Sequence, residues 1–314
     1  MPRSARLKLS AIQAWYHLHS RVAGHRGEYP LAEPIARRHL VETIEHYAGI
    51  YFCRVAAFSV MGNHYHLIVR FEAPVPVSRR ELRRRAFLMY SGRKKREEID
   101  TWSEEEWEHY RRRLFDVSEF MRNVQGSFAR WYNRAFDRRG RFWAERFKSV
   151  VLGDLRAVLD CMLYVELNAV RAGLVERPEE WAGSSVCLRE VGEGGWLMPL
   201  REVLVLPGSE RAALREYRER MYYRGSVPTK EGQAAISEEV LERERARGFE
   251  TRGMYLRRLG YFVDGLAIGT EQFLREQLAR MREEGRYLRR KHPIRQLGGI
   301  HLSLREQRSH AVVF

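Results

Sequence analysis

Two histidines, His64 and His66, lie two residues apart in the apolar run FSVMGNHYHLIVR. Side chains at i and i+2 of a β-strand point to the same face of a sheet, so both imidazoles would share one face. Paired neutral imidazoles are suitable nitrogen ligands for a divalent metal. A lone His-x-His motif also occurs by chance, as at His17 and His19 in this chain. The pair therefore indicates a candidate metal site and needs support from the rest of the sequence.

A second group of chemically useful residues lies in the segment DLRAVLDCMLYVELNAVRAGL, which has helical spacing. Tyr164, Asn168 and Arg171 stand at i, i+4 and i+7, which places them on one stripe of a helix. A tyrosine can act as a nucleophile where a metal or a base favours its phenolate. The amide oxygen of asparagine is a hard ligand for a divalent cation. Spacing alone leaves open that Tyr164 is an ordinary packed aromatic residue.

The elements that must position these residues follow from the hydrophobic periodicity. The pattern predicts a strand, a helix, a hairpin of two strands joined by MGN, a helix, a strand and a last helix that Asp154 caps. This order is a split βαβ, ferredoxin-like layout with an added helix. We therefore predict an α+β fold in which an antiparallel sheet carries helices. The expected ranges are 12–22, 32–49, 50–60, 64–72, 117–140, 141–152 and 154–174.

Two further regions lie outside this layout. Residues 73–116 begin with two prolines and then alternate basic and acidic blocks, so we predict a charged helical insertion. Residues 186–314 form a basic region with amphipathic segments at 209–225 and 270–293, which predicts a helical C-terminal region with a possible role in DNA binding. The first domain would then span residues 1–185.

Charge and composition restrict the class of partner. The 314 residues carry 56 Lys and Arg against 41 Asp and Glu, a formal net charge of +15. Such an excess favours a polyanion, and nucleic acid is the usual one; an arginine-rich proteome is the alternative explanation. No apolar run approaches the roughly 20 residues of a membrane helix. The three cysteines are scattered, so we expect no zinc knuckle and no disulfide framework. We further expect a cytoplasmic, nucleoid-associated protein with no membrane association and no organic cofactor.

Three blocks in order, VMGNHYHLIV, GRFWAERFKS and YVELNAVRAGLV, resemble the signature blocks of the REP-associated tyrosine transposases (RAYTs). These proteins belong to the single-tyrosine HUH transposases, and the strand WYHLHSRV also resembles the first strand of that family. The resemblance spans about residues 10–185. Gly62 departs from the pattern because the family commonly has proline there, and we expect a looser hairpin with unchanged ligands. The insertion at 73–116 is the other departure.

The resemblance implies a function residue by residue. His64 and His66 match the metal ligands, Asn168 matches a polar third ligand, and Tyr164 matches the nucleophile. It further implies a Mg²⁺- or Mn²⁺-dependent endonuclease and strand transferase that acts on single-stranded or hairpin DNA, as in transposition and DNA recombination at REP elements. The intermediate would be a 5′-phosphotyrosine. The family includes dimers as well as monomers, so the chain would be a monomer or a homodimer.

Further candidates for DNA contact come from charge and aromatic character. Basic side chains could neutralise phosphates, and an exposed indole could stack on a base. For the insertion arginines a solvated helix is the alternative, and for the tryptophan it is core packing. The candidates are Lys148, Arg171, Arg83, Arg84, Arg85 and Trp143.

Other classes of protein stay open at this point. Rolling-circle initiators and relaxases also combine a histidine pair with a tyrosine, and a domesticated relative could bind DNA without catalysis. A structural metal centre is disfavoured because two imidazoles and one amide leave the coordination open.

Overall fold

Four strands form the centre of the sheet: β1 (Ala14–Arg21), β2 (Cys53–Val60), β3 (His64–Phe71) and β4 (Lys148–Leu152). They lie in the order β2-β3-β1-β4, and each neighbouring pair is antiparallel. Helix α1 (Pro34–Ile50) connects β1 to β2, and α5 (Val117–Ala135) precedes β4. This topology confirms the predicted α+β fold with a split βαβ arrangement.

The computed structural model describes most of the chain. The described residues are 6–25, 27–90, 93–228, 231–249, 265–284, 294–297 and 301–304. Within these ranges, no helix has the length and apolar character needed to cross a membrane.

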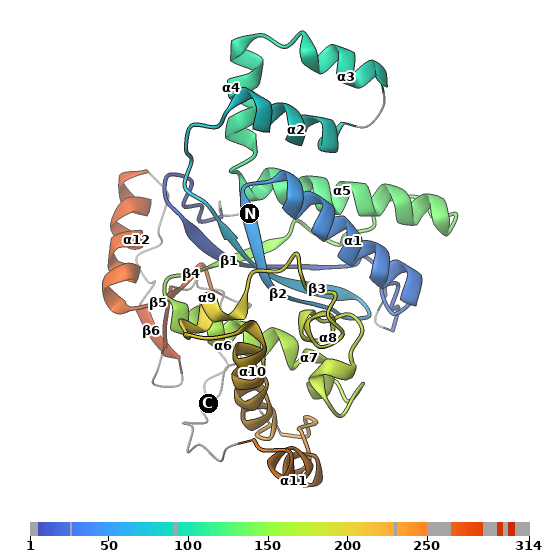
Figure 1. Ribbon diagram of the computed structural model, residues 1–314, viewed down its shortest axis with the longest axis vertical. Helices are drawn as coiled ribbons and strands as arrows, with labels where there is room; N and C mark the ends of the chain where they lie inside the picture. The colour runs from blue at the N-terminus through green and yellow to red at the C-terminus, as the bar shows by residue number, and fades with distance from the viewer. Residues whose placement is uncertain are drawn as a thin grey trace.

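The two faces of the sheet have separate hydrophobic clusters, because successive side chains of each strand alternate between faces. Helices α1 and α5 cover one face, where Leu18, Tyr65 and Leu67 pack with Ile44 and Phe128. Helix α6 (Leu155–Glu166) lies on the other face (Figure 1). The opposite face of the sheet and α6 together make the surface on which the predicted site residues lie.

Helix α6 is the predicted added helix, and its first turn is capped as expected. The Asp154 side chain accepts a hydrogen bond of 2.8 Å from the backbone N–H of Ala157. Val158, Cys161 and Met162 are fully buried in the second hydrophobic cluster, which also contains Ile68 of β3. A short helix, α7 (Asn168–Arg171), continues directly from α6.

Glu166, at the end of α6, is fully buried and predicts a pH-dependent stability. It accepts hydrogen bonds from the Ser185 hydroxyl and from the backbone N–H of Val186, at the start of α8 (Ser185–Glu190). Burial raises the pKa of Glu166 to about 7. Because the folded state then binds the proton more tightly than the unfolded state, Glu166 contributes stability at low pH that is lost as the pH rises from 4.5 to 7. The loss between pH 5 and 7.5 should be about 2 kcal/mol.

The test is urea unfolding of the wild type and Glu166→Gln at pH 5 and pH 7.5. The glutamine variant keeps the shape of the side chain and cannot ionise, so its stability should fall by about 2 kcal/mol less than that of the wild type over this interval. Equal pH dependence in both proteins would contradict an elevated pKa at Glu166.

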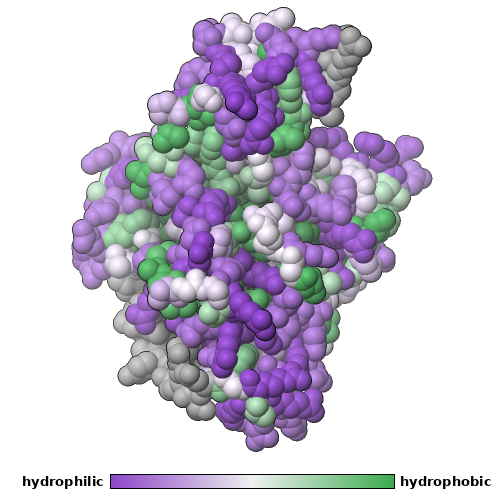
Figure 2. All heavy atoms as spheres, in the orientation of Figure 1, coloured by the Kyte–Doolittle hydropathy of each residue, from purple (hydrophilic) through white to green (hydrophobic). Residues whose placement is uncertain are grey.

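The insertion forms three helices, as predicted: α2 (Arg79–Met89), α3 (Arg93–Asp100) and α4 (Glu104–Arg113). They protrude beyond α1 and α5 at the top of Figure 1. Ser103 and Glu106 form a capping box that starts α4. Trp107 is buried, with its ring centroid 4.8 Å from that of Trp102. The aromatic residues of the insertion belong to the same hydrophobic cluster as α1 and α5, and Figure 2 shows the surface of the insertion as mainly hydrophilic.

The described part of the C-terminal region is mostly helical, as predicted. It also contributes strands that the sequence pattern does not predict. Strand β5 pairs parallel with β4, and β7 and β6 follow, which gives a seven-stranded sheet in the order β2-β3-β1-β4-β5-β7-β6. The division at residue 185 stays a prediction, although Tyr217 and Met221 of α10 share a hydrophobic cluster with α6. The remaining elements are η1 (Pro178–Glu180), α9 (Leu200–Leu204), α10 (Glu210–Gly225), α11 (Glu238–Ala246), β5 (Ala267–Gly269), α12 (Glu271–Glu283), β6 (Ile294–Leu297) and β7 (His301–Leu304).

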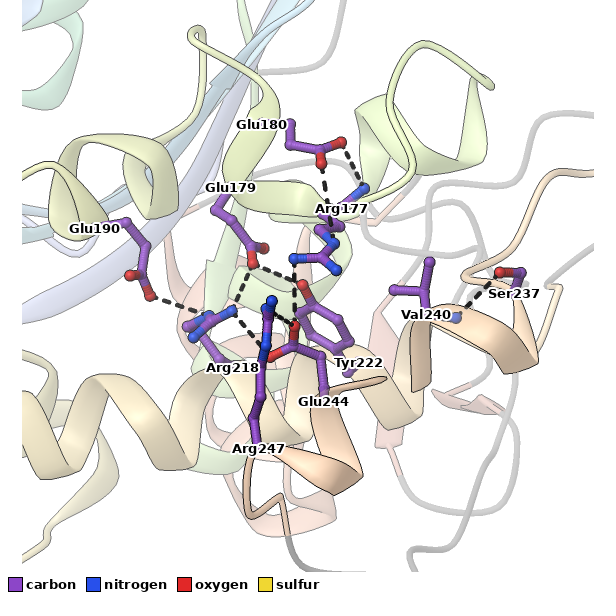
Figure 3. Close-up of polar contacts among 10 residues, drawn as sticks. All are labelled: Arg177, Glu179, Glu180, Glu190, Arg218, Tyr222, Ser237, Val240, Glu244 and Arg247. Carbon is purple, nitrogen blue, oxygen red and sulfur yellow. Dashed lines mark hydrogen bonds and ion pairs between the residues drawn. The ribbon is translucent and has the colours of Figure 1, made fainter. Parts of the chain in front are cut away.

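A largely buried ionic network holds α10 and α11 against the segment that follows α7 (Figure 3). Arg218 of α10 lies 2.6 Å from Glu179, 3.0 Å from Glu190 and 3.5 Å from Glu244. The Glu244 side chain is only 2% exposed and also lies 3.3 Å from Arg177. The Arg218 guanidinium therefore contacts carboxylates of three different segments, and Glu244 has Arg177 as a second partner.

Replacing Arg218 should destabilise the fold strongly. Arg218→Ala would leave buried carboxylates without their shared counter-charge, and we expect a loss of about 3–5 kcal/mol in the free energy of unfolding. Arg275→Ala is the control, because Arg275 pairs with Glu271 on the exposed surface of α12 and should change stability by less than about 0.5 kcal/mol. Urea denaturation of both variants measures the difference, and equal effects would contradict the role of Arg218.

Candidate active site

His64 and His66 lie on β3 and point to the face of the sheet that α6 covers. Their ring centroids are 5.1 Å apart, with the rings perpendicular. His66 is 3% exposed and His64 is half-buried. Tyr65, between them, points to the other face and packs in the first hydrophobic cluster. The predicted alternation, with both imidazoles on one face, is therefore confirmed.

Two more histidines join this pair from the neighbouring strand. The antiparallel register of β1 and β3 places His19 directly opposite His66. His17 lies on the same face, and its Nε2 is 2.9 Å from Nδ1 of His66. In the sequence, His17 and His19 are only a second occurrence of the His-x-His motif. The pairing of β1 with β3 is what brings them to the site.

The hydrogen bonds of the pair leave the same ring atom available on each imidazole. Nδ1 of His64 lies 2.9 Å from the amide oxygen of Asn63, to which it can only donate. In the neutral ring, Nε2 of His64 is then unprotonated and carries a lone pair. When Nδ1 of His66 donates to His17, Nε2 of His66 is a lone pair as well. Second-shell partners of this kind fix the tautomer of metal-binding histidines.

Electrostatics keep both imidazoles neutral. Burial, together with the positive charge of Arg21, lowers the pKa of His64 to about 4. Burial likewise holds the pKa of His66 well below its usual range, and His17, His64 and His19 add to the effect. Neutral imidazole is the protonation state that a metal requires.

Tyr164 reaches the histidines from α6 of the same chain. Its ring centroid lies 5.9 Å from that of His66 and 6.4 Å from that of His17. The ring is partly exposed rather than sealed in the core. The phenol of Tyr164 therefore faces the imidazole pair, because α6 packs on the sheet face that carries the histidines.

Asn168 and Arg171 follow Tyr164 on α7. Asn168 is partly exposed, and its amide nitrogen is buried without a hydrogen-bond partner among the described residues. The guanidinium of Arg171 lies 5.6 Å from the ring centroid of Tyr164. Arg171 thus shares the stripe of Tyr164, as predicted.

Lys148 and Trp143 lie on opposite sides of the sheet. Lys148 is opposite His19 in the register of β1 and β4, so it lies on the histidine face, where it is exposed and 3.5 Å from Glu145. Trp143 packs on the other face, with its ring centroid 5.3 Å from that of Tyr65 and its indole N–H donating to the backbone carbonyl of Gln125. Lys148 can therefore contribute to this site, and Trp143 has a packing role away from it.

The three insertion arginines lie on α2, and each of them already has a carboxylate partner. Arg83 donates to Asp100 at 2.8 Å, and Arg84 donates to Glu81 at 2.8 Å. Arg85 also contacts Glu81, and it donates to the carbonyls of Ile50 at 2.6 Å and of Tyr51 at 3.0 Å. Acids of the same insertion therefore pair with these arginines, and a role of the three in DNA contact stays a prediction.

Gly62 does not loosen the hairpin, contrary to expectation. Its carbonyl accepts a hydrogen bond of 2.8 Å from Leu31, and the carbonyl of Asn63 accepts one of 2.8 Å from Val22. A Cβ atom at Gly62 would lie 2.8 Å from the ring of Tyr29. A larger residue at position 62 would therefore need the exposed Tyr29 side chain to shift.

The donor atoms fit a divalent metal in part. Two neutral imidazoles with available Nε2 atoms are suitable ligands for a divalent transition metal, whereas Mg²⁺ and Mn²⁺ prefer oxygen ligands and would need them in addition to the imidazoles. Across the part of the chain that the structure describes, no group of three or more His, Cys, Asp or Glu side chains is arranged to hold a metal ion. Completion of the coordination must therefore come from an amide such as that of Asn168, from water or from a substrate oxygen.

Comparisons with known proteins add a structural likeness. No family model matches the sequence, and no curated protein matches it either. Among solved structures, the chain is similar to a REP-associated tyrosine transposase bound to a REP hairpin, with 15% sequence identity and a TM-score of 0.40. The match covers 67% of this chain and 93% of that chain. A likeness of this size does not assign an activity, so the functional argument rests on the site.

Proposed function

We propose that this chain is a metal-dependent endonuclease and strand transferase for single-stranded DNA, of the single-tyrosine HUH type. The observation that carries the proposal is the approach of the Tyr164 ring to His66 within one chain, 5.9 Å between ring centroids. A nucleophile beside a pair of neutral imidazoles is the combination that phosphodiester transfer needs. The net charge of +15 favours a polyanionic substrate.

His64, His66 and Asn168 would hold Mg²⁺ or Mn²⁺. When bound, the cation would polarise the scissile phosphate and offset its charge. Nδ1 contacts with Asn63 and His17 orient the two imidazoles for this task. The pKa values of both histidines, lowered by burial, keep protons from competing for the ligand atoms at neutral pH.

Tyr164 would carry the covalent step. Its phenolic oxygen attacks the phosphorus, a new P–O bond forms to tyrosine, and the bond to the 3′ oxygen of the neighbouring nucleotide breaks. The phenolic proton is lost and the departing 3′ oxygen gains a proton, so the products are a 5′-phosphotyrosine and a 3′-hydroxyl. Attack of a 3′-hydroxyl on the phosphotyrosine reverses the step and joins strands without ATP. Because one chain supplies both the histidines and the tyrosine, a monomer would suffice.

The experiment that tests the proposal uses single-stranded oligonucleotides with hairpins, labelled at either end, and Mn²⁺. We expect an SDS-stable adduct that carries the 3′ label, and free product that carries the 5′ label. EDTA should abolish the adduct. Addition of an acceptor strand with a free 3′-hydroxyl should yield a joined product, which a simple nickase would give poorly. Binding without any adduct would instead assign a non-catalytic DNA-binding protein.

A further inference from the structure

Arg171 carries a buried charge that the protein leaves without a hydrogen-bond partner. Its residue is 8% exposed, and none of its three guanidinium nitrogens has a hydrogen-bond partner in the described part of the chain. Burying a cation in this way costs free energy, since the lost hydration is not replaced. The insertion arginines Arg83 and Arg84 show the ordinary alternative, a facing carboxylate.

A second buried arginine approaches the same place from the C-terminal helices. Arg224 of α10 is 7% exposed, and its Nη1 lies 3.6 Å from the carboxylate of Asp160. Its Nη2 has no hydrogen-bond partner among the described residues. The pKa of Arg171 is lowered to about 10, chiefly by burial; Tyr164 opposes this shift, and the positive charge of Arg224 adds to it.

The charges at this point do not balance. Arg224 pairs with one carboxylate, Asp160, which stands one turn before Tyr164 on α6, and Arg171 has no carboxylate partner among the described residues. One positive charge is therefore left over beside the tyrosine ring. Guanidinium groups bind phosphate with paired, charge-assisted hydrogen bonds, and unused donors next to a reacting phenol suit that ligand.

We infer that Arg171 and Arg224 form a binding subsite for a backbone phosphate of the DNA strand, next to the phosphate that Tyr164 attacks. The inference rests on the proposed function for the identity of the strand. It also gives α10 a task in substrate binding, because Arg224 reaches Asp160, one turn before Tyr164, from outside the ferredoxin-like core. The arginine pair is then a positioning device that holds the strand in register with the nucleophile.

The test measures binding rather than cleavage, in a Tyr164→Phe background. Fluorescence anisotropy with a labelled single-stranded oligonucleotide compares Arg171→Met, Arg224→Met and a control, Arg220→Met. Arg220 lies on the same helix as Arg224 and donates to Glu216 at 2.8 Å, so the control removes one charge whose partner is already present. We expect about tenfold weaker binding for each of the first two variants and less than about twofold for the control.

Two further measurements separate phosphate binding from a structural role. The slope of log affinity against log salt should fall by about 0.7 for each lost phosphate contact. The melting temperature of DNA-free Arg171→Met should equal or exceed that of its parent, because the substitution removes an unpartnered buried charge. Inorganic phosphate, at matched ionic strength, should raise the melting temperature of the parent and not that of Arg171→Met.

Unchanged affinity in both variants would overturn the subsite, and so would an equal loss in all three. A lower melting temperature with unchanged affinity would assign Arg171 a structural role and overturn it as well. Should Arg171→Met fail to fold, Arg224→Met decides the question. If the wild type forms no covalent adduct but the two variants still lose affinity, the subsite stands and the proposed catalysis fails.

Discussion

Tyr164→Phe should abolish the covalent protein–DNA adduct and lower strand cleavage by on the order of 10⁴-fold. The substitution removes the attacking oxygen and leaves the ring, which is partly exposed and faces His66 and His17. Folding and single-strand binding should therefore stay within about twofold of the wild type. The measurement is the yield of SDS-stable adduct together with single-turnover cleavage in Mn²⁺.

A matched control comes from another partly buried tyrosine. Tyr90→Phe removes a hydroxyl from the insertion, far from the histidines, and should leave adduct formation unchanged. An adduct that persisted in Tyr164→Phe would assign the nucleophile to a different residue. Loss of DNA binding together with cleavage would mean that Tyr164 supports the fold rather than the chemistry.

His64→Ala should lower Mn²⁺-dependent cleavage by on the order of 10³-fold, because the ligand set would lose one of its two imidazoles. His64 is the better choice for substitution, since His66 is almost fully buried and its loss would leave a cavity. The affinity for Mn²⁺ should weaken in parallel, and electron paramagnetic resonance of the free ion measures that affinity. The exposed His109 on α4 supplies the control variant, His109→Ala, which should behave as the wild type.

The low pKa of His64 adds a second readout to this experiment. A histidine with its ordinary pKa would lose metal as the pH falls below about 6.5, since protons compete for the ring nitrogen. With a folded pKa of about 4, metal binding at His64 should be constant from pH 8 to pH 6 and fail only as the pH approaches 4. A decline centred near pH 6.5 would show that the imidazole is not held neutral by burial.

Local patterns were sufficient to predict the elements that carry the site. A two-residue period put His64 and His66 on one face, and a helical period put Tyr164 and Arg171 on one stripe. The N-cap at Asp154 fixed the start of α6. These are short-range properties of the backbone, so a single sequence contains them.

Properties that depend on non-local contact could not be predicted in the same way. The contact of His17 with His66 arises only when β1 pairs with β3 in one register. The charge of Arg85 is matched by Glu81 and by carbonyls at the end of α1, over thirty residues away. Strand β4 begins only at Lys148, because the preceding residues fold as irregular chain around Trp143 instead of extending the ladder.

The parallel pairing of β5 with β4 has a consequence for any attempt to isolate the catalytic core. In a four-stranded sheet, β4 would be an edge strand with the backbone N–H groups of Val151 and Gly153 free to pair with another molecule. Ala267 and Ile268 of β5 occupy that position instead. A shortened protein that ended before β5 would expose the unpaired edge of β4. We therefore expect self-association to be its first defect, before any loss of the histidine and tyrosine geometry.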